Sequence, residues 1–156
     1  GYTTGGFSIS VTDYWFNGGP GYFHYGSHNT NHTFEAQIGY DFGPLALNWY
    51  TNFAGTDGVN NEGDRAYSSY ISATVPFTLA GLEWTAEIGA TPWATDFYNY
   101  SEDPVCNGSN GFAVCDISLG AAKEIRITDS FSVPAFAKVT VNPRTEGAYF
   151  VFGLSF

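Results

Sequence analysis

The stretch Ala148 to Phe156 reads A-Y-F-V-F-G-L-S-F and carries an aromatic or aliphatic side chain at every second position. Because side chains of a β-strand alternate between its two faces, Ala148, Phe150, Phe152, Leu154 and Phe156 share one face. A strand of this length matches the roughly 9–11 residues that a tilted transmembrane β-strand needs. The alternative is a buried strand of a soluble β-sandwich. The rest of the chain favours the transmembrane strand.

Composition predicts an all-β chain. The 156 residues are enough for a single domain spanning 1–156, with 19% aromatic and only 13% charged residues and with 19 glycines. Apolar and polar residues are interleaved, and no stretch approaches the roughly 18 consecutive apolar residues of a membrane helix. If the chain enters a bilayer, it must therefore do so as a closed β-barrel.

The charge balance argues against a nucleic-acid partner. The formal net charge is −10, and only five residues are Lys or Arg. Nucleic-acid binding depends on neutralising phosphates with such residues, and no basic patch is available here.

Alternation bounded by turn residues predicts eight strands, at 7–16, 32–42, 45–54, 66–78, 82–93, 112–127, 131–142 and 148–156. The connections between them are alternately short and long, which is typical of outer-membrane barrels with short periplasmic turns and long extracellular loops. Both chain ends then lie on the periplasmic side. Residues 1–12 follow the same plan as residues 38–49, so we expect Gly1 and Tyr2 to be the tail of a missing N-terminal strand.

The two faces of these strands differ in a way that predicts their surroundings. One face is apolar, whereas the other is mostly Ser, Thr, Asn, Gly and Tyr with a few carboxylates. The outer polar face of a soluble barrel should be rich in Lys, Arg and Glu, and this one is not. We therefore expect an antiparallel transmembrane up-and-down β-barrel, with the apolar face toward outer-membrane lipid or lipopolysaccharide and the polar face lining a lumen.

The predicted lumen carries more acids than bases. Its charged residues are Glu35, Asp41, Glu83, Glu87, Asp116, Glu124, Arg126 and Lys138. We expect Arg126 and Lys138 to form ion pairs with Glu124 and with Glu87 or Asp116, because an unpaired charge in a low-dielectric space is costly. Such pairs could fill and rigidify a closed interior. Alternatively, the net negative charge makes a weakly cation-preferring pore.

Two cysteines bracket part of the third long loop. Cys106 and Cys115 are an even pair in a chain expected outside the cytoplasm, which favours a disulfide, with two separate free thiols as the alternative.

Other loop residues suggest metal or catalytic chemistry only weakly. His24, His28 and His32 recur every four residues, but that spacing aligns ligands only on a helix, so exposed loop histidines are the better interpretation. The acids Asp57, Glu62 and Asp64 do not fit a calcium-loop pattern and predict a solvated loop. No Ser nucleophile is matched to a His and an acid, so neither an enzyme, a metal nor a cofactor is expected.

Several segments resemble the TorF type of porin-like outer-membrane proteins of Gram-negative bacteria, in its Bacteroidetes-like branch. They are Gly5–Phe16, Trp49–Gly55, Ala66–Ile71, Gly89–Trp93, Ala121–Phe136 and Asn142–Phe156. The resemblance implies about twelve strands in the intact protein, with additional N-terminal strands that include a Tyr-Val-Trp-Arg-Gly type of segment absent here. It implies no substrate and no catalytic residue. The final Phe156 is similar to the C-terminal signal that the barrel-insertion machinery reads in such proteins.

These observations predict a small porin-like barrel in the outer membrane, for passive passage of small polar solutes or cations. The alternative is a closed structural or accessory barrel that docks other outer-membrane proteins in a larger complex.

Overall fold

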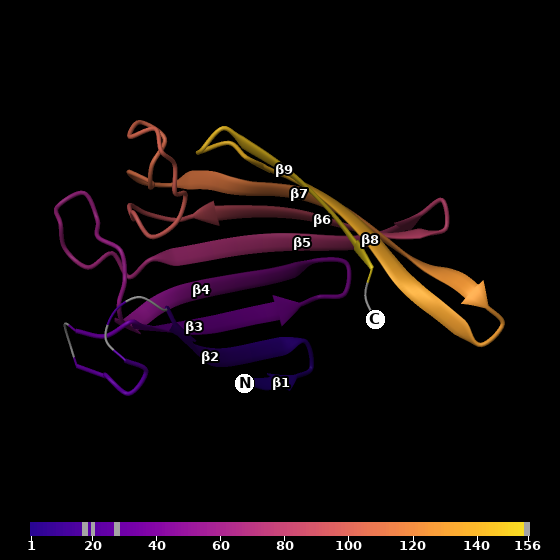
Figure 1. Cartoon of the computed structure of the whole chain (residues 1–156), viewed down its shortest axis with the longest axis horizontal. Coiled ribbons are helices and arrows are strands. Elements are labelled where there is room, and N and C mark those ends of the chain that lie inside the picture. Colours follow the sequence, from indigo (N-terminus) through magenta and orange to yellow (C-terminus); the bar gives the residue numbers. More distant parts are fainter. Residues whose placement is uncertain (17–18, 20, 27–28, 155–156) are drawn as a thin grey trace.

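The computed structural model of the protein describes residues 1–16, 19, 21–26 and 29–154. They form one antiparallel sheet of nine strands, in which each strand pairs with the next along the chain (Figure 1). The strands are β1 (Tyr2–Thr4), β2 (Phe7–Trp15), β3 (His32–Asp41), β4 (Ala46–Gly55), β5 (Ser69–Leu79), β6 (Leu82–Thr91), β7 (Ala113–Thr128), β8 (Phe131–Asn142) and β9 (Gly147–Leu154). The described residues contain no helix long and apolar enough to cross a membrane.

Turn chemistry separates the two ends of the sheet. At one end the hairpins are tight. Most of the left-handed conformations in these turns fall on glycines, such as Gly6 (φ 86°), Gly43 (φ 91°) and Gly81 (φ 72°), and Ala80 (φ 55°) is the exception. The long connections 56–68 and 92–112 lie together at the other end, on the left in Figure 1. We call these the turn end and the loop end.

The prediction of an all-β antiparallel chain is confirmed, and the eight predicted strands correspond closely to β2 through β9. The ninth strand is β1, which was expected only as the tail of a strand. It pairs Tyr2 with Ile9 and Thr4 with Phe7 across the turn at Gly5 and Gly6.

Cross-strand pairing gathers apolar and polar side chains into separate rows. One apolar row crosses eight strands from β2 to β9 through Phe7, Tyr40, Leu47, Ala73, Ile88, Ile117, Val141 and Ala148. One residue further along the strands, a polar row runs through Ser8, Gly39, Asn48, Ser72, Gly89 and Asp116. Paired residues share a face, so the sheet has one apolar and one polar face.

Burial in this sheet is inverted relative to an ordinary domain core. Among the residues that the structure describes, the buried hydrophobic ones are Ala66, Ala90, Cys115 and Val133. The buried polar ones are His32, Thr33, Asn52, Ser68, Ser69, Ser72, Thr91, Thr95, Ser109 and Ser118. Large apolar strand residues remain exposed, for example Phe150 (70%), Val11 (62%) and Ile38 (51%). Soluble monomers rarely expose contiguous apolar patches of such extent.

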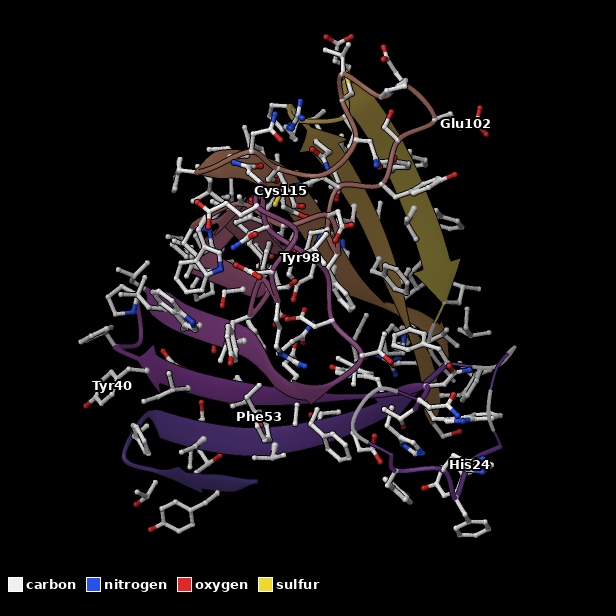
Figure 2. The ribbon with its side chains drawn as sticks, turned by 90° about the vertical axis from the view of Figure 1, so that its left-hand side faces the viewer. His24, Tyr40, Phe53, Tyr98, Glu102 and Cys115 are labelled. Atoms are coloured by element: carbon white, nitrogen blue, oxygen red, sulfur yellow. The ribbon has the colours of Figure 1, made fainter. Side chains whose placement is uncertain are left out.

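The sheet is strongly curled but not closed. In Figure 2, which views the molecule from the side where the long loops lie in Figure 1, Tyr98 and Cys115 lie within the curl of the sheet and Tyr40 lies outside it. Among the described residues, β9 pairs only with β8, and β1 covers only Phe7–Ile9 of β2. Two strand edges are therefore free.

Candidate functional site on the polar face of the sheet

A hydrogen-bonded cluster covers the polar face of β2, β3 and β4. The Gln37 amide nitrogen donates to Ser8 Oγ and to Asn48 Oδ1, each at 3.0 Å, and Ser10 Oγ donates to Gln37 Oε1 at 3.2 Å. These side chains fill the space above Gly39, where a Cβ would collide with the polar ends of Asn48, Gln37 and Ser8. A larger residue at position 39 would therefore break the cluster.

Tyrosines form a layer next to this cluster. Tyr50 and Tyr70 lie 6.2 Å apart between ring centroids, and Tyr98 from the third long loop lies 6.2 Å from Tyr70. The Tyr70 ring lies directly over Gly89, which leaves no room for a side chain there. Burial raises the pKa of the Tyr98 phenol, so this hydroxyl remains a neutral donor at ordinary pH.

The phenols and hydroxyls bind the acids of this face. Tyr14 donates to Glu35 Oε1 at 3.2 Å, and Thr74 Oγ1 donates to Glu87 Oε2 at 3.0 Å. Ser118 Oγ donates to Asp116 and lies 2.8 Å from Thr140 Oγ1. These carboxylates are thus held by neutral groups.

The ion pairs predicted for the lumen are not those that form. Within the described part of the chain, the ion pairs are His32–Asp13, Arg65–Asp57 and Arg126–Asp129. Arg126 binds Asp129 in its own hairpin because β6 pairs with β7 only as far as Ala122, so the tip of the β7–β8 hairpin extends beyond the sheet. The expectation that Arg126 and Lys138 pair with Glu124 and with Glu87 or Asp116 is therefore wrong in this structure.

The eight predicted lumen residues are divided along the strands. Glu35, Glu87, Asp116 and Lys138 are half-buried, whereas Asp41, Glu83, Glu124 and Arg126 are exposed toward the turn end. Asp41 has a local role there, since its carboxylate accepts a hydrogen bond from the Gly43 N–H at 2.7 Å. The half-buried acids and the tyrosine layer form the candidate site.

The third long loop is tied down at the loop end of this site. Thr95 and Ser109 exchange two backbone hydrogen bonds of 2.8 and 2.7 Å, which closes the base of the loop. Their hydroxyls contact the residue before β5 and the last residue of β6, with Ser68 Oγ 2.6 Å from Thr95 Oγ1 and Thr91 Oγ1 2.9 Å from Ser109 Oγ. All four residues are buried.

Polar contacts also join this loop to its two neighbours. Asn142 Nδ2 donates to Asn99 Oδ1 at 3.1 Å, and the Arg144 Nε donates to the Gly108 carbonyl at 2.7 Å. On the other side, Asn61 donates to the Asn110 carbonyl at 3.0 Å. We call these three joined connections, 56–68, 92–112 and 143–146, the loop cap.

Asp57 is the centre of the loop cap, although its stretch was predicted to be a solvated loop. Its side chain is only 2% exposed and lies 3.6 Å from Arg65 Nε. It accepts hydrogen bonds from Asn52 Nδ2 at 3.1 Å and from the backbone N–H groups of Gly58 and Ser68 at 2.8 and 3.2 Å. The carboxylate is buried because the loop folds back and places it against three buried donors.

The prediction that His32 is an exposed loop histidine is also wrong. It is completely buried under the stacked ring of Tyr25, at 4.3 Å between centroids. Its Nδ1 lies 2.8 Å from the Asp13 carboxylate and its Nε2 2.5 Å from the Tyr22 carbonyl. Both partners are acceptors, so the imidazolium, with two donors, satisfies both. His24 is exposed, and His28 lies outside the described residues.

The expected disulfide is not formed, since Cys106 and Cys115 are both free thiols. Cys115 is buried at the β-bulge where Asp116 pairs with Gly89 but Val114 pairs with Ala90. Cys106 instead belongs to a turn in which its N–H bonds to the Asp103 carbonyl at 3.0 Å.

We predict that a maleimide will label two thiols per chain in denaturant without reductant, because neither sulfur is consumed. In the native chain the half-buried Cys106 should react faster than the buried Cys115. Intact mass spectrometry measures the number of labels per chain in denaturant and the rate of labelling in the native chain. Labelling that appears only after reduction would contradict the free-thiol state.

The remaining predicted site residue, Phe156, lies outside the described residues. Among those that are described, no three His, Cys, Asp or Glu side chains converge as a metal-ligand set.

Comparison with protein-family models, with curated proteins and with solved structures gives no match. The class that the fold defines is an all-β antiparallel sheet with inverted polarity. What such a sheet does must be inferred from its own residues.

Proposed function

We propose that the protein is a porin-like outer-membrane β-barrel for passive passage of small polar solutes or cations. The observation that carries the proposal is the inverted burial, with polar residues inside the curl and large apolar residues exposed outside it. In a bilayer the apolar rows would contact acyl chains, and the polar rows would line the lumen. The long loops would then be extracellular and the turn end periplasmic.

Membrane insertion adds one requirement. A sheet edge with unpaired N–H and C=O groups is not tolerated in hydrocarbon, so the edges of β2 and β9 must be paired in the functional state. The proposal therefore includes further strands that complete the ring. At the turn end, β1 already pairs with the first residues of β2. A ring of more than eight strands would also leave a water path along its axis. In a ring of eight, side chains fill the interior.

The charge of the candidate site supports cation preference. Glu35, Glu87 and Asp116 are half-buried and bound by hydroxyl groups rather than by bases in the described structure. A lumen lined by net negative charge lowers the barrier for cations.

We predict that the Glu35→Gln, Glu87→Gln double variant will lose cation preference, because two charges leave the lumen while its hydrogen-bonding shape is kept. The measurement is the reversal potential of the purified chain in planar bilayers under a KCl gradient. The control is Asp129→Asn, which removes an exposed acid at a hairpin tip. Absence of channel steps in the unsubstituted protein, or its anion preference, would contradict the porin proposal.

One observation favours the alternative of a closed accessory barrel. The loop cap joins three connections by contacts such as Asn142–Asn99 and Asn61–Asn110, so it covers the loop end of the polar face. If the double variant and the unsubstituted protein are both silent in bilayers but inserted, this closed barrel, docking other outer-membrane proteins, becomes the better proposal.

A further inference from the structure

A buried histidine joins segment 21–26 to the apolar face of the sheet. His32 is the first residue of β3, and its exposed fraction is 0%. Asp13 of β2 lies diagonal to it on the same face. The Tyr25 ring stacks on the imidazole at 4.3 Å between centroids, and the Tyr22 ring meets it edge-on at 5.0 Å. We call Asp13, Tyr22, Tyr25 and His32 the histidine latch.

Both ring nitrogens of His32 face an oxygen acceptor. Nδ1 lies 2.8 Å from the Asp13 carboxylate, and Nε2 lies 2.5 Å from the Tyr22 backbone carbonyl. A neutral imidazole carries one N–H, whereas the imidazolium carries two. Only the imidazolium can therefore donate to both acceptors of the latch at once.

Loss of one proton from His32 would affect the two contacts unequally. The remaining N–H stays on Nδ1, because the other tautomer would turn a lone pair toward the Asp13 carboxylate. Nε2 then presents its own lone pair to the Tyr22 carbonyl oxygen, at a distance that suits only a hydrogen bond. The neutral ring therefore stays attached to β2 and repels the backbone of segment 21–26.

Neutral and half-exposed contacts make up the rest of this attachment. Tyr22 and Tyr25 are 48% and 54% exposed, so their packing removes only part of their apolar surface from water. A single neutral hydrogen bond joins Thr30 Oγ1 to the His24 carbonyl, at 2.6 Å. Hydrogen bonds from a charged donor are stronger than such neutral ones. The contact with His32 is therefore the one that decides whether the segment stays on the sheet.

We propose that the histidine latch is a pH-sensitive device, which holds segment 21–26 on the sheet while both nitrogens of His32 are protonated and releases it when the ring becomes neutral. Closing the latch takes up a proton wherever the free imidazole is neutral, which is above a pH of about 6.5. The ratio of open to closed chains therefore rises with pH, by at most about tenfold per pH unit for one proton. Under the proposed function this segment is extracellular, so the latch responds to the pH of the medium.

The other groups that face His32 do not change charge in the same pH range. Among the described residues they are the Asp13 carboxyl from β2 and the phenols of Tyr22 and Tyr25 from the connection. Phe34, which stacks on the imidazole from β3, is uncharged. Carboxyl groups ordinarily titrate at a pH of about 4 and phenols at about 10. Between these limits the imidazole is the group of the latch that titrates.

The test measures how fast chymotrypsin cleaves segment 21–26 in the full chain in nonionic detergent, from about pH 6 to about pH 9. Cleavage after Tyr22, Phe23 and Tyr25 is divided by that of a synthetic peptide with the sequence of residues 16–31, which corrects for the pH profile of the protease. We expect this relative rate to rise about tenfold, because it follows the population of the open form. The urea midpoint of the sheet should stay constant. A relative rate that is constant or falls as the pH rises would overturn the inference.

Nuclear magnetic resonance of the same chain with isotope-labelled histidine identifies the group responsible. One imidazole should titrate in step with the relative rate, and its signal should be missing from His32→Gln. If no histidine titrates over the range in which the rate rises, the device proposed here does not exist.

Three variants separate titration from a merely structural role of the histidine. His32→Gln cannot take up a proton, so its relative rate should not depend on pH. Asp13→Asn keeps an oxygen acceptor but removes the charge that retains the proton, so half-opening should move down by about one pH unit. The matched control is His24→Gln, an exposed position in the same segment, which should behave like the unsubstituted chain. Equal pH dependence in His32→Gln, or an unchanged midpoint in Asp13→Asn, would overturn the inference.

Discussion

Replacing Leu119 by arginine should lower the equilibrium constant for insertion into lipid vesicles by about 30- to 700-fold. Leu119 lies in the middle of β7, pairs with Ala86 and Val139 and is 45% exposed on the apolar face. An arginine at the midplane of a lipid-facing strand costs about 2–4 kcal/mol. In a water-bathed protein, by contrast, an exposed position of this kind changes stability by only about 0.5 kcal/mol.

The matched control is Thr85→Arg. Thr85 neighbours Ala86 on β6, pairs with Gly120 on the polar face and is exposed. Because a hydrated lumen accepts a charged side chain, this variant should insert like the unsubstituted chain. Insertion is measured by vesicle flotation with urea titration. Equal insertion of the two variants, or an unsubstituted chain that stays in water as a monomer, would contradict the inside-out orientation.

The strands and their faces could be predicted because both depend on local information. A period of two in the sequence places side chains on alternate faces whatever the rest of the chain does. The row from Phe7 to Ala148 is a direct consequence, since a slip of one residue in any pair would move its apolar side chains to the polar face. The curl and the free edges depend on the whole sheet and were not readable strand by strand.

The loop residues were missed because their environments depend on contacts between distant residues. Asp57 was assigned to solvent, yet its partner Ser68 is itself held by Thr95, 27 positions further along the chain. Arg126 was placed in the lumen by alternation, which cannot tell that its hairpin extends beyond β6. Alternation also cannot locate the bulge that buries Cys115.

The Asp13–His32 ion pair was not predicted, although the sequence contains a signal for it. Asp13 interrupts the apolar alternation of β2, and an antiparallel register places it opposite Phe34 while Trp15 lies opposite His32. Residues diagonal to each other on one face are within reach of long side chains. A charge on an apolar face, with a histidine diagonal to it, could therefore have predicted the ion pair.

Replacing Asp57 by alanine should destabilise the loop cap by about 1–3 kcal/mol, the cost of leaving a buried hydrogen-bond donor without its acceptor. The carboxylate is nearly inaccessible, and its loss leaves the Asn52 amide and the N–H groups of Gly58 and Ser68 without their acceptor. Connection 56–68 should then become sensitive to protease. Asp64→Ala is the control, because Asp64 is exposed in the same connection.

The two readouts separate the loop cap from the sheet. Limited proteolysis of the inserted chain measures how accessible the loops are. The urea midpoint measures the stability of the strands, whose pairing does not involve Asp57. We expect early cleavage in 56–68 with little change in insertion, and Asp57→Asn should be milder because it keeps an oxygen acceptor. If the loop cap closes the pore, Asp57→Ala should also raise bilayer conductance above that of Asp64→Ala. Cleavage equal to that of the control would mean that the carboxylate is not what holds these loops together.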